Sequence, residues 1–106
     1  MNQMDIARLQ DKAEEATKLL EAMANTKRLL ILCSLLEREM NVSELEERVI
    51  LAQSALSQHL AKLRAWGLVK ARRDGQQVHY SLASDAVRDV LSTLYQIYCV
   101  RGATDP

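Results

Sequence analysis

The sequence is poor in the residue types that mark secreted, fibrous or membrane-spanning chains. Its 106 residues include no Phe, one Trp, three Tyr, one Pro, three Gly and two Cys. No segment approaches the roughly 20 consecutive apolar residues that a transmembrane helix needs, and the N-terminus lacks the apolar core of a signal peptide. The single Pro is the last residue, so no internal linker is evident. We therefore expect one cytoplasmic domain over residues 1–106, without a membrane contact and with an aliphatic core.

The net charge is zero, but the charges are unevenly distributed along the chain. Residues 53–80 carry five Lys and Arg side chains and one Asp, whereas residues 1–50 are acidic on balance. A solvated surface is one interpretation of such a pattern. Because the basic segment coincides with a predicted helix and hairpin, we favour a basic face for nucleic-acid phosphates and an acidic back.

Apolar residues with helical spacing predict long helices over residues 3–23, 27–39 and 84–100. Asn25 or Thr26 is expected to cap the second of these helices. Ser43 with Glu46 has the spacing of a capping box, which predicts a short helix over about 44–50. The last helix is apolar on more than one face, and the first is longer than a minimal domain needs. Burial within one domain is the alternative, but this excess favours a homodimer through the terminal helices.

Residues 52–82 predict a recognition helix followed by a β-hairpin. Leu56, Leu60 and Leu63 form one apolar stripe, and Gly67 marks the end of the helix. The segments 68–73 and 76–82 then flank Asp74-Gly75, a strong hairpin signal. We expect a mainly α fold with a small β-hairpin, a winged helix-turn-helix in the order α-α-α-α-β-β-α. A two-fold dimer of this kind suits double-stranded DNA with an inverted-repeat operator.

The opposite face of the predicted recognition helix carries short hydroxyl and amide side chains, which suit hydrogen bonding to base edges. Long cations near the end of the helix and in the hairpin suit phosphates or an adjacent minor groove. No catalytic triad, phosphate loop or metal cluster is evident, so an enzyme is not expected. Tyr80 and His59 are expected to pack locally. The predicted base-edge residues are Gln53, Ser54, Ser57 and Gln58, the phosphate contacts Lys62 and Arg64, and the wing contacts Arg72, Arg73 and Gln76.

The segments AMANTKRLLIL, VSELE, QSALSQHLAKLR and VHYSL resemble the ArsR/SmtB family of dimeric bacterial repressors over nearly the whole chain. The resemblance implies an effector-controlled repressor. Ala52 departs from it, because relatives often carry a helix-capping Ser there. Family metal sensors use a CxC pair or a His/Asp set, but residues 41–43 read Asn-Val-Ser. A ligand set starting at Asp85 would require Val87, Tyr98 and Arg101. We expect no metal and no cofactor.

Cys33 and Cys99 look like the cysteine pair of the BigR/SqrR-type persulfide-sensing branch, to which HlyU-type regulators are similar; NolR-like relatives have similar QSALSQHL segments without this pair. That resemblance implies a thiol form that binds DNA and is released when sulfane sulfur links the cysteines by a di- or polysulfide. Two alternatives stay open. The cysteines are core residues in a regulator with no thiol switch, or the winged helix is a protein-interaction module that does not bind DNA.

Overall fold

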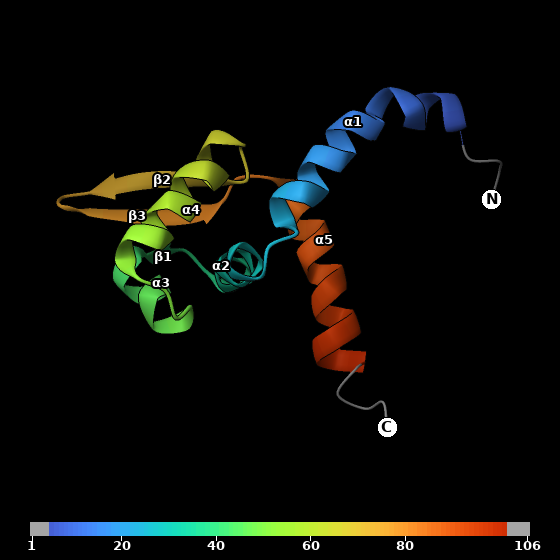
Figure 1. Ribbon diagram of the computed structural model, residues 1–106. Coiled ribbons are helices and arrows are strands. Elements are labelled where there is room, and N and C mark those ends of the chain that lie inside the picture. Colours follow the sequence, from blue (N-terminus) through green and yellow to red (C-terminus); the bar gives the residue numbers. More distant parts are fainter. Residues whose placement is uncertain (1–4, 102–106) are drawn as a thin grey trace.

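The computed structural model describes residues 5–101 and has the predicted mainly helical architecture with a small antiparallel sheet (Figure 1). A two-residue strand before the third helix, which the sequence did not indicate, enlarges the hairpin to three strands. In chain order the elements are α1 (Ile6–Met23), α2 (Thr26–Glu37), β1 (Met40–Asn41), α3 (Val42–Arg48), α4 (Gln53–Ala65), β2 (Val69–Asp74), β3 (Gln77–Leu82), α5 (Asp85–Tyr95) and a π-helical segment, η1 (Gln96–Arg101).

Side-chain caps set the starts of most helices, and one predicted cap is wrong. Asn25 caps α2 by accepting from the Arg28 amide at 3.0 Å, as expected. The predicted Ser43 box is replaced by one in which Asn41 accepts from the Glu44 amide at 2.9 Å and Glu44 accepts from the Asn41 amide at 3.0 Å. The cause is β1: its extended backbone ends at Asn41 and places the helix start two residues early.

The ends of two predicted helices also differ from the structure. The helix expected over 27–39 ends at Glu37, because Arg38 is extended and the chain joins the sheet at Met40. The helix expected over 84–100 is α-helical only to Tyr95 and continues as η1. Residues 3 and 4 of the first predicted helix lie outside the described residues.

One apolar core joins α2, α3, α4, the sheet and α5. The stripe predicted for the recognition helix is fully buried, with Leu56, Leu60 and Leu63 at most 1% exposed. From α5, Val87 and Leu91 reach the same core, and Met40 contributes from β1. Tyr80 packs against this core from β3, as the sequence predicted. The burial of α4 on one side leaves its other side for solvent or a ligand.

The sheet has the order β1-β3-β2, with the β2–β3 hairpin as the wing. Asp74 pairs with Gln77, so the two-residue turn is Gly75-Gln76 rather than the predicted Asp74-Gly75. Gly75 has φ +64°, while no non-glycine residue among those described has positive φ. A two-residue turn with only its first central residue at positive φ is of type II′, which places Gly first.

The two terminal helices lie at the end of the molecule away from the wing tip (Figure 1). Both have exposed apolar side chains, including Ile6 and Leu9 on α1, Tyr95 on α5, and Tyr98 in η1, which is 72% exposed. Single exposed apolar residues are ordinary in a folded protein, and here several of them occur on the two terminal helices.

Arg28 connects α1 to α2 and to the residue that follows α4. Its Nε donates to the Ala22 carbonyl at 2.7 Å and its Nη2 to the Glu21 carbonyl at 3.2 Å, both at the end of α1. The same guanidinium lies 5.3 Å from the centre of the Trp66 ring, just after α4. Carbonyl capping and a cation–π contact thus fix α1 relative to α2 and α4.

Candidate DNA interface and thiol pair

The recognition helix α4 has a hydrogen-bonded cap at its C-terminus but no side-chain cap at its N-terminus. After Ala65, the Gly67 amide donates to the Arg64 carbonyl at 3.0 Å and the Leu68 amide to the Leu63 carbonyl at 2.9 Å. These two bonds, with Gly67 at φ +79°, form a Schellman motif. At the start, Ala52 provides no side-chain cap. The helix is therefore fixed by its buried face and its C-terminal end.

The predicted base-reading residues all lie on the exposed side of α4. Gln53, Ser54, Ser57 and Gln58 are exposed and span the first turn and a half of the helix. Lys62 and Arg64, the predicted phosphate contacts, are exposed in its last turn. The structure thus brings the six α4 residues onto one accessible element.

His59 lies between these exposed residues and the core. Its side chain is half-buried, and its Nδ1 is buried without a hydrogen-bond partner among the described residues. Burial, followed by the charges of Arg28 and Lys62, lowers the pKa of His59. The half-buried ring therefore packs in place, which agrees with the local role expected from the sequence. No group of three or more metal-ligating side chains occurs within residues 5–101.

The two wing arginines lie on opposite faces of the hairpin. Arg73 pairs with Val78, on the face that also carries Ala71 and Tyr80. Arg72 pairs with His79 and points to the other face, because successive strand residues alternate. Gln76 is exposed in the turn. The sequence did not distinguish the two arginines, whereas the register separates them.

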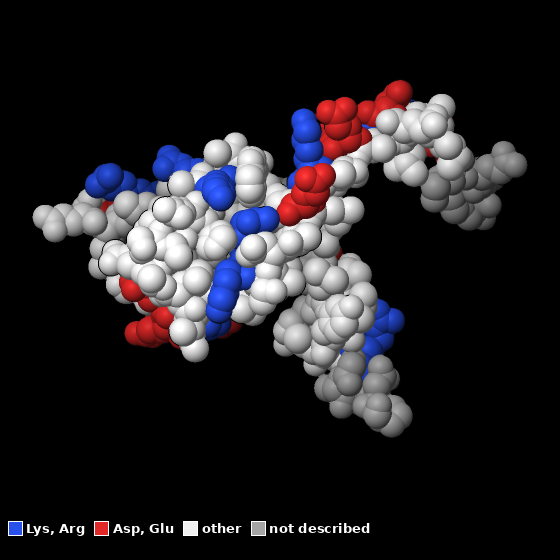
Figure 2. Space-filling view, viewed as in Figure 1, with Lys and Arg blue, Asp and Glu red and all other residues white. Residues whose placement is uncertain are grey.

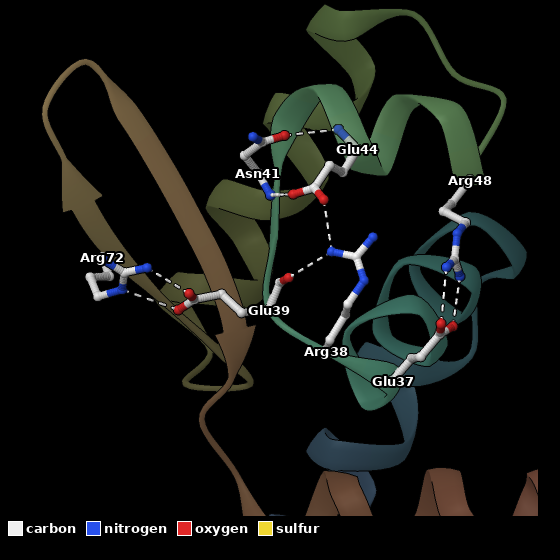
Figure 3. A network of polar contacts seen from close by, with 7 residues as sticks. All are labelled: Glu37, Arg38, Glu39, Asn41, Glu44, Arg48 and Arg72. Carbon is white, nitrogen blue, oxygen red and sulfur yellow. Dashed lines mark hydrogen bonds and ion pairs between the residues drawn. The ribbon is translucent and has the colours of Figure 1, made fainter.

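Arg72 already has an anionic partner. Its Nη2 lies 2.7 Å and its Nε 3.3 Å from the two carboxylate oxygens of Glu39, the residue before β1 (Figure 3). The hydrogen bond from Arg72 lowers the pKa of Glu39 and raises that of Arg72. Sequence reasoning missed this pair, because 33 residues separate its members.

Two further ion pairs brace the neighbouring elements (Figure 3). Arg48 at the end of α3 binds both carboxylate oxygens of Glu37 at 2.8 and 3.1 Å. Arg38 contacts Glu44 at 2.7 Å and also donates to the Glu39 carbonyl at 3.3 Å. These contacts connect the end of α2 with α3 and, through Glu39 and Arg72, with the wing.

Charges of opposite sign are unevenly distributed over the visible surface, although α1 carries both signs (Figure 2). Lys and Arg side chains lie over the wing and across the body beside α4, whereas Asp and Glu gather on α1 and below α3. The basic side chains over the wing and beside α4 agree with the basic segment noted in the sequence.

Both cysteines are free thiols that are not bonded to each other. Cys33 is a half-buried residue of α2 that packs against the core, and Cys99 is exposed in η1, the continuation of α5. Burial and, secondarily, the charge of Cys99 raise the pKa of Cys33. Core filling accounts for Cys33 but not for the exposed Cys99.

A recognition helix with an exposed polar face, a preceding helix and a basic hairpin on one core define the winged helix-turn-helix class of DNA-binding proteins. Residues 25–71 match the family model described as "Bacterial regulatory protein, arsR family". The chain belongs to this family, and it is a DNA-binding transcriptional regulator rather than an enzyme. None of the helices among residues 5–101 is long and apolar enough to cross a membrane.

The similarity to individual members extends over most of the chain. The transcriptional activator HlyU of Vibrio cholerae is 47% identical over 96 residues, which is 91% of this chain and 89% of that protein. The nodulation protein NolR of Rhizobium meliloti is 57% identical over 83% of this chain and 72% of its own. The crystal structure of the transcriptional repressor BigR from Xylella fastidiosa superposes with a TM-score of 0.85 at 34% identity, over 92% and 99% of the two chains.

Proposed function

We propose that the chain is a homodimeric repressor that binds an inverted-repeat operator and leaves it when sulfane sulfur links Cys33 to Cys99. The observation that carries the DNA-binding part is the exposed polar row of α4 above a fully buried leucine stripe. The relatives include an activator and a repressor by name. We favour repression, because a two-fold dimer over promoter DNA obstructs transcription sterically.

Each side chain has a role set by its position. Gln53, Ser54, Ser57 and Gln58 contact base edges in the major groove, where amide and hydroxyl groups discriminate bases by about 1–3 kcal/mol per good bidentate pair. Lys62 and Arg64 bind phosphates, which sets affinity and its salt dependence.

The wing contributes unequally to this interface. Arg73 and Gln76 contact the backbone or the adjacent minor groove without losing an ion pair seen in the structure. Arg72 contributes when a phosphate replaces Glu39, because its guanidinium is already bound at 2.7 Å. The wing is therefore partly neutralised in the free protein.

The dimer uses α1 and α5 with η1. Burial against another surface would remove their exposed apolar side chains from water. These include Ile6, Leu9, Tyr95 and Tyr98. A second copy provides that surface, and it sets the spacing of the two recognition helices to about one turn of DNA. Small changes at α5 then move both helices relative to successive grooves.

The different exposure of the two cysteines supports an order of steps for the proposed thiol switch. Cys99 is exposed in the single chain, whereas Cys33 is half-buried and its pKa is raised by burial, so the Cys99 thiolate is the proposed first attacker. It attacks the central sulfur of an organic trisulfide, breaks one S–S bond and expels one thiolate of the donor. The Cys33 thiolate then attacks the transferred sulfur and expels the second donor thiolate, which leaves a Cys33–Sn–Cys99 bridge. The donor is reduced to two thiol-level products, so electrons balance.

The bridge connects α2 to η1 and changes how α5 sits in the dimer. Inserted sulfur atoms span a wider gap than a disulfide, which needs Cα atoms within about 7 Å. Two states that differ in the arrangement of α5 give different operator affinities, which is the requirement for allosteric release.

The DNA-binding part is tested by selecting duplexes from a randomised pool and measuring affinity by fluorescence anisotropy. We expect an inverted repeat, with Gln58→Ala losing discrimination at particular positions. The matched variant Lys62→Ala should weaken binding to all sequences alike. Recovery of no duplex above the non-specific background would instead favour a protein-interaction module.

The thiol part is tested by intact mass spectrometry and peptide mapping after treatment with an organic polysulfide or with peroxide. We expect a Cys33–Cys99 crosslink that carries extra sulfur with the polysulfide, together with loss of operator binding. Cys33→Ser and Cys99→Ser should bind DNA but ignore the donor. If both single variants still respond, or if wild-type thiols stay unmodified, the switch is wrong and the regulator has another signal.

A further inference from the structure

Lys27 lies beside the entrance to the recognition helix although it belongs to α2. Its Nζ donates to the carbonyl oxygen of Ile50 at 3.2 Å in a solvent-exposed hydrogen bond. Ile50 is in the turn between α3 and α4, three residues before Gln53, and is 86% exposed. The Lys27 ammonium therefore reaches the N-terminal side of the helix proposed to enter the groove.

Folding stability gives little reason for a cation at this position. The first turn of a helix disfavours positive charge, yet α2 has Lys27 and Arg28 there and no acidic residue. Arg28 is accounted for by its bonds to the α1 carbonyls and its contact with Trp66. Lys27 has one exposed hydrogen bond and, within residues 5–101, no carboxylate within 4.0 Å.

We propose that Lys27 binds a backbone phosphate at the rim of the groove that receives α4. This rests on the proposed DNA-binding function and adds a third element, α2, to an interface otherwise formed by α4 and the wing. An ammonium has three donors, and the bond to Ile50 uses one, which leaves the others for phosphate oxygens. Contacts of this kind fix the orientation of a protein on the duplex and carry no sequence information.

The position of Lys27 gives the phosphate contact a second effect. Because the same ammonium binds the Ile50 carbonyl, the phosphate, the α3–α4 turn and the start of α4 become one hydrogen-bonded unit. The contact thereby sets how deeply the first turn of α4 enters the groove. Lys27 is thus both a DNA contact and a positioning residue for Gln53 and Ser54.

The test is the salt dependence of operator affinity for full-length Lys27→Gln, measured between about 50 and 200 mM salt. Each lost phosphate contact lowers the slope of log K against log salt by about 0.9. Two Lys27 side chains in a dimer therefore lower it by about 1.8. The ratio of the wild-type operator-binding constant to that of Lys27→Gln should then fall roughly 12-fold as salt rises fourfold. Lys27→Arg should retain the wild-type slope.

Lys12→Gln is the matched control, since it removes the same charge from an exposed α1 lysine and should leave the slope unchanged. If Lys27→Gln weakens binding equally at all salt concentrations, Lys27 only braces Ile50 and the proposal is overturned. A slope equal to wild type with unchanged affinity overturns it as well. Absence of operator binding by the wild-type protein would be a separate result, the failure of the proposed function. Circular dichroism melting establishes that the variants are folded.

Discussion

The absence of a side-chain cap at the N-terminus of α4 leads to a prediction about stability. The four other α-helices begin with a side-chain cap, from Asp5, Asn25, Asn41 and Ser84, whereas Ala52 has none. Ala52 already has the extended backbone of an N-cap, with φ −61° and ψ 145°, and its carbonyl accepts the Leu56 amide at 3.0 Å. Ala52→Ser therefore adds an acceptor for the Ala55 amide without moving the backbone.

The expected gain follows from known capping energies. A Ser in place of Ala at an N-cap stabilises a protein by about 1 kcal/mol, within a range of roughly 0.5–2 kcal/mol. For a domain of this size, 1 kcal/mol raises Tm by about 4–8 °C. Calorimetry or circular dichroism melting would measure it at one fixed protein concentration, because a dimer's Tm depends on concentration.

The control for this change is Ala61→Ser, which puts the same side chain at an exposed position within α4. It should destabilise slightly, by less than about 0.7 kcal/mol, because Ser is a poorer helix former than Ala. If Ala52→Ser melts at or below the wild-type temperature, or matches Ala61→Ser, then the start of α4 does not have the geometry described here.

Two further predictions concern charge. Because Cys99 raises the pKa of Cys33 in addition to burial, Cys99→Ser should shift the pH profile of Cys33 alkylation by iodoacetamide to lower pH; an unshifted profile would mean that the thiols are too far apart to interact. Glu39→Gln releases Arg72 and should raise operator affinity and steepen its salt dependence, whereas Glu37→Gln, whose partner Arg48 is on α3, should change neither beyond the effect of net charge. An equal response of both variants would show that Arg72 does not reach DNA.

The local features of the fold could be predicted from the sequence because they depend on short-range spacing. The leucines at 56, 60 and 63, the stop at Gly67, the cap at Asn25 and the glycine of the hairpin each act within one turn of helix or hairpin. The same pattern identified the exposed polar row, because a residue opposite a buried stripe on an amphipathic helix faces solvent.

Errors arose where tertiary pairing competed with a local signal. The Ser43 and Glu46 box has valid spacing, but pairing of Met40 with Tyr80 holds β1 extended up to Asn41, and the helix starts from there. The hairpin turn is one residue later than predicted, because cross-strand register decides which of several turn residues occupy the loop.

The sequence by itself determined the class of this protein: amphipathic periodicity, capping and turn chemistry, and a basic segment are properties of neighbouring residues, and together they specify a winged helix with one face for DNA. Only the tertiary structure decided which cations are available and which thiol is accessible. The Arg72–Glu39 pair, the Lys27 contact with Ile50 and the electrostatic effect of Cys99 on the pKa of Cys33 involve residues 23 to 66 positions apart. No local pattern encodes such contacts, because they form only when the core has fixed the elements relative to one another.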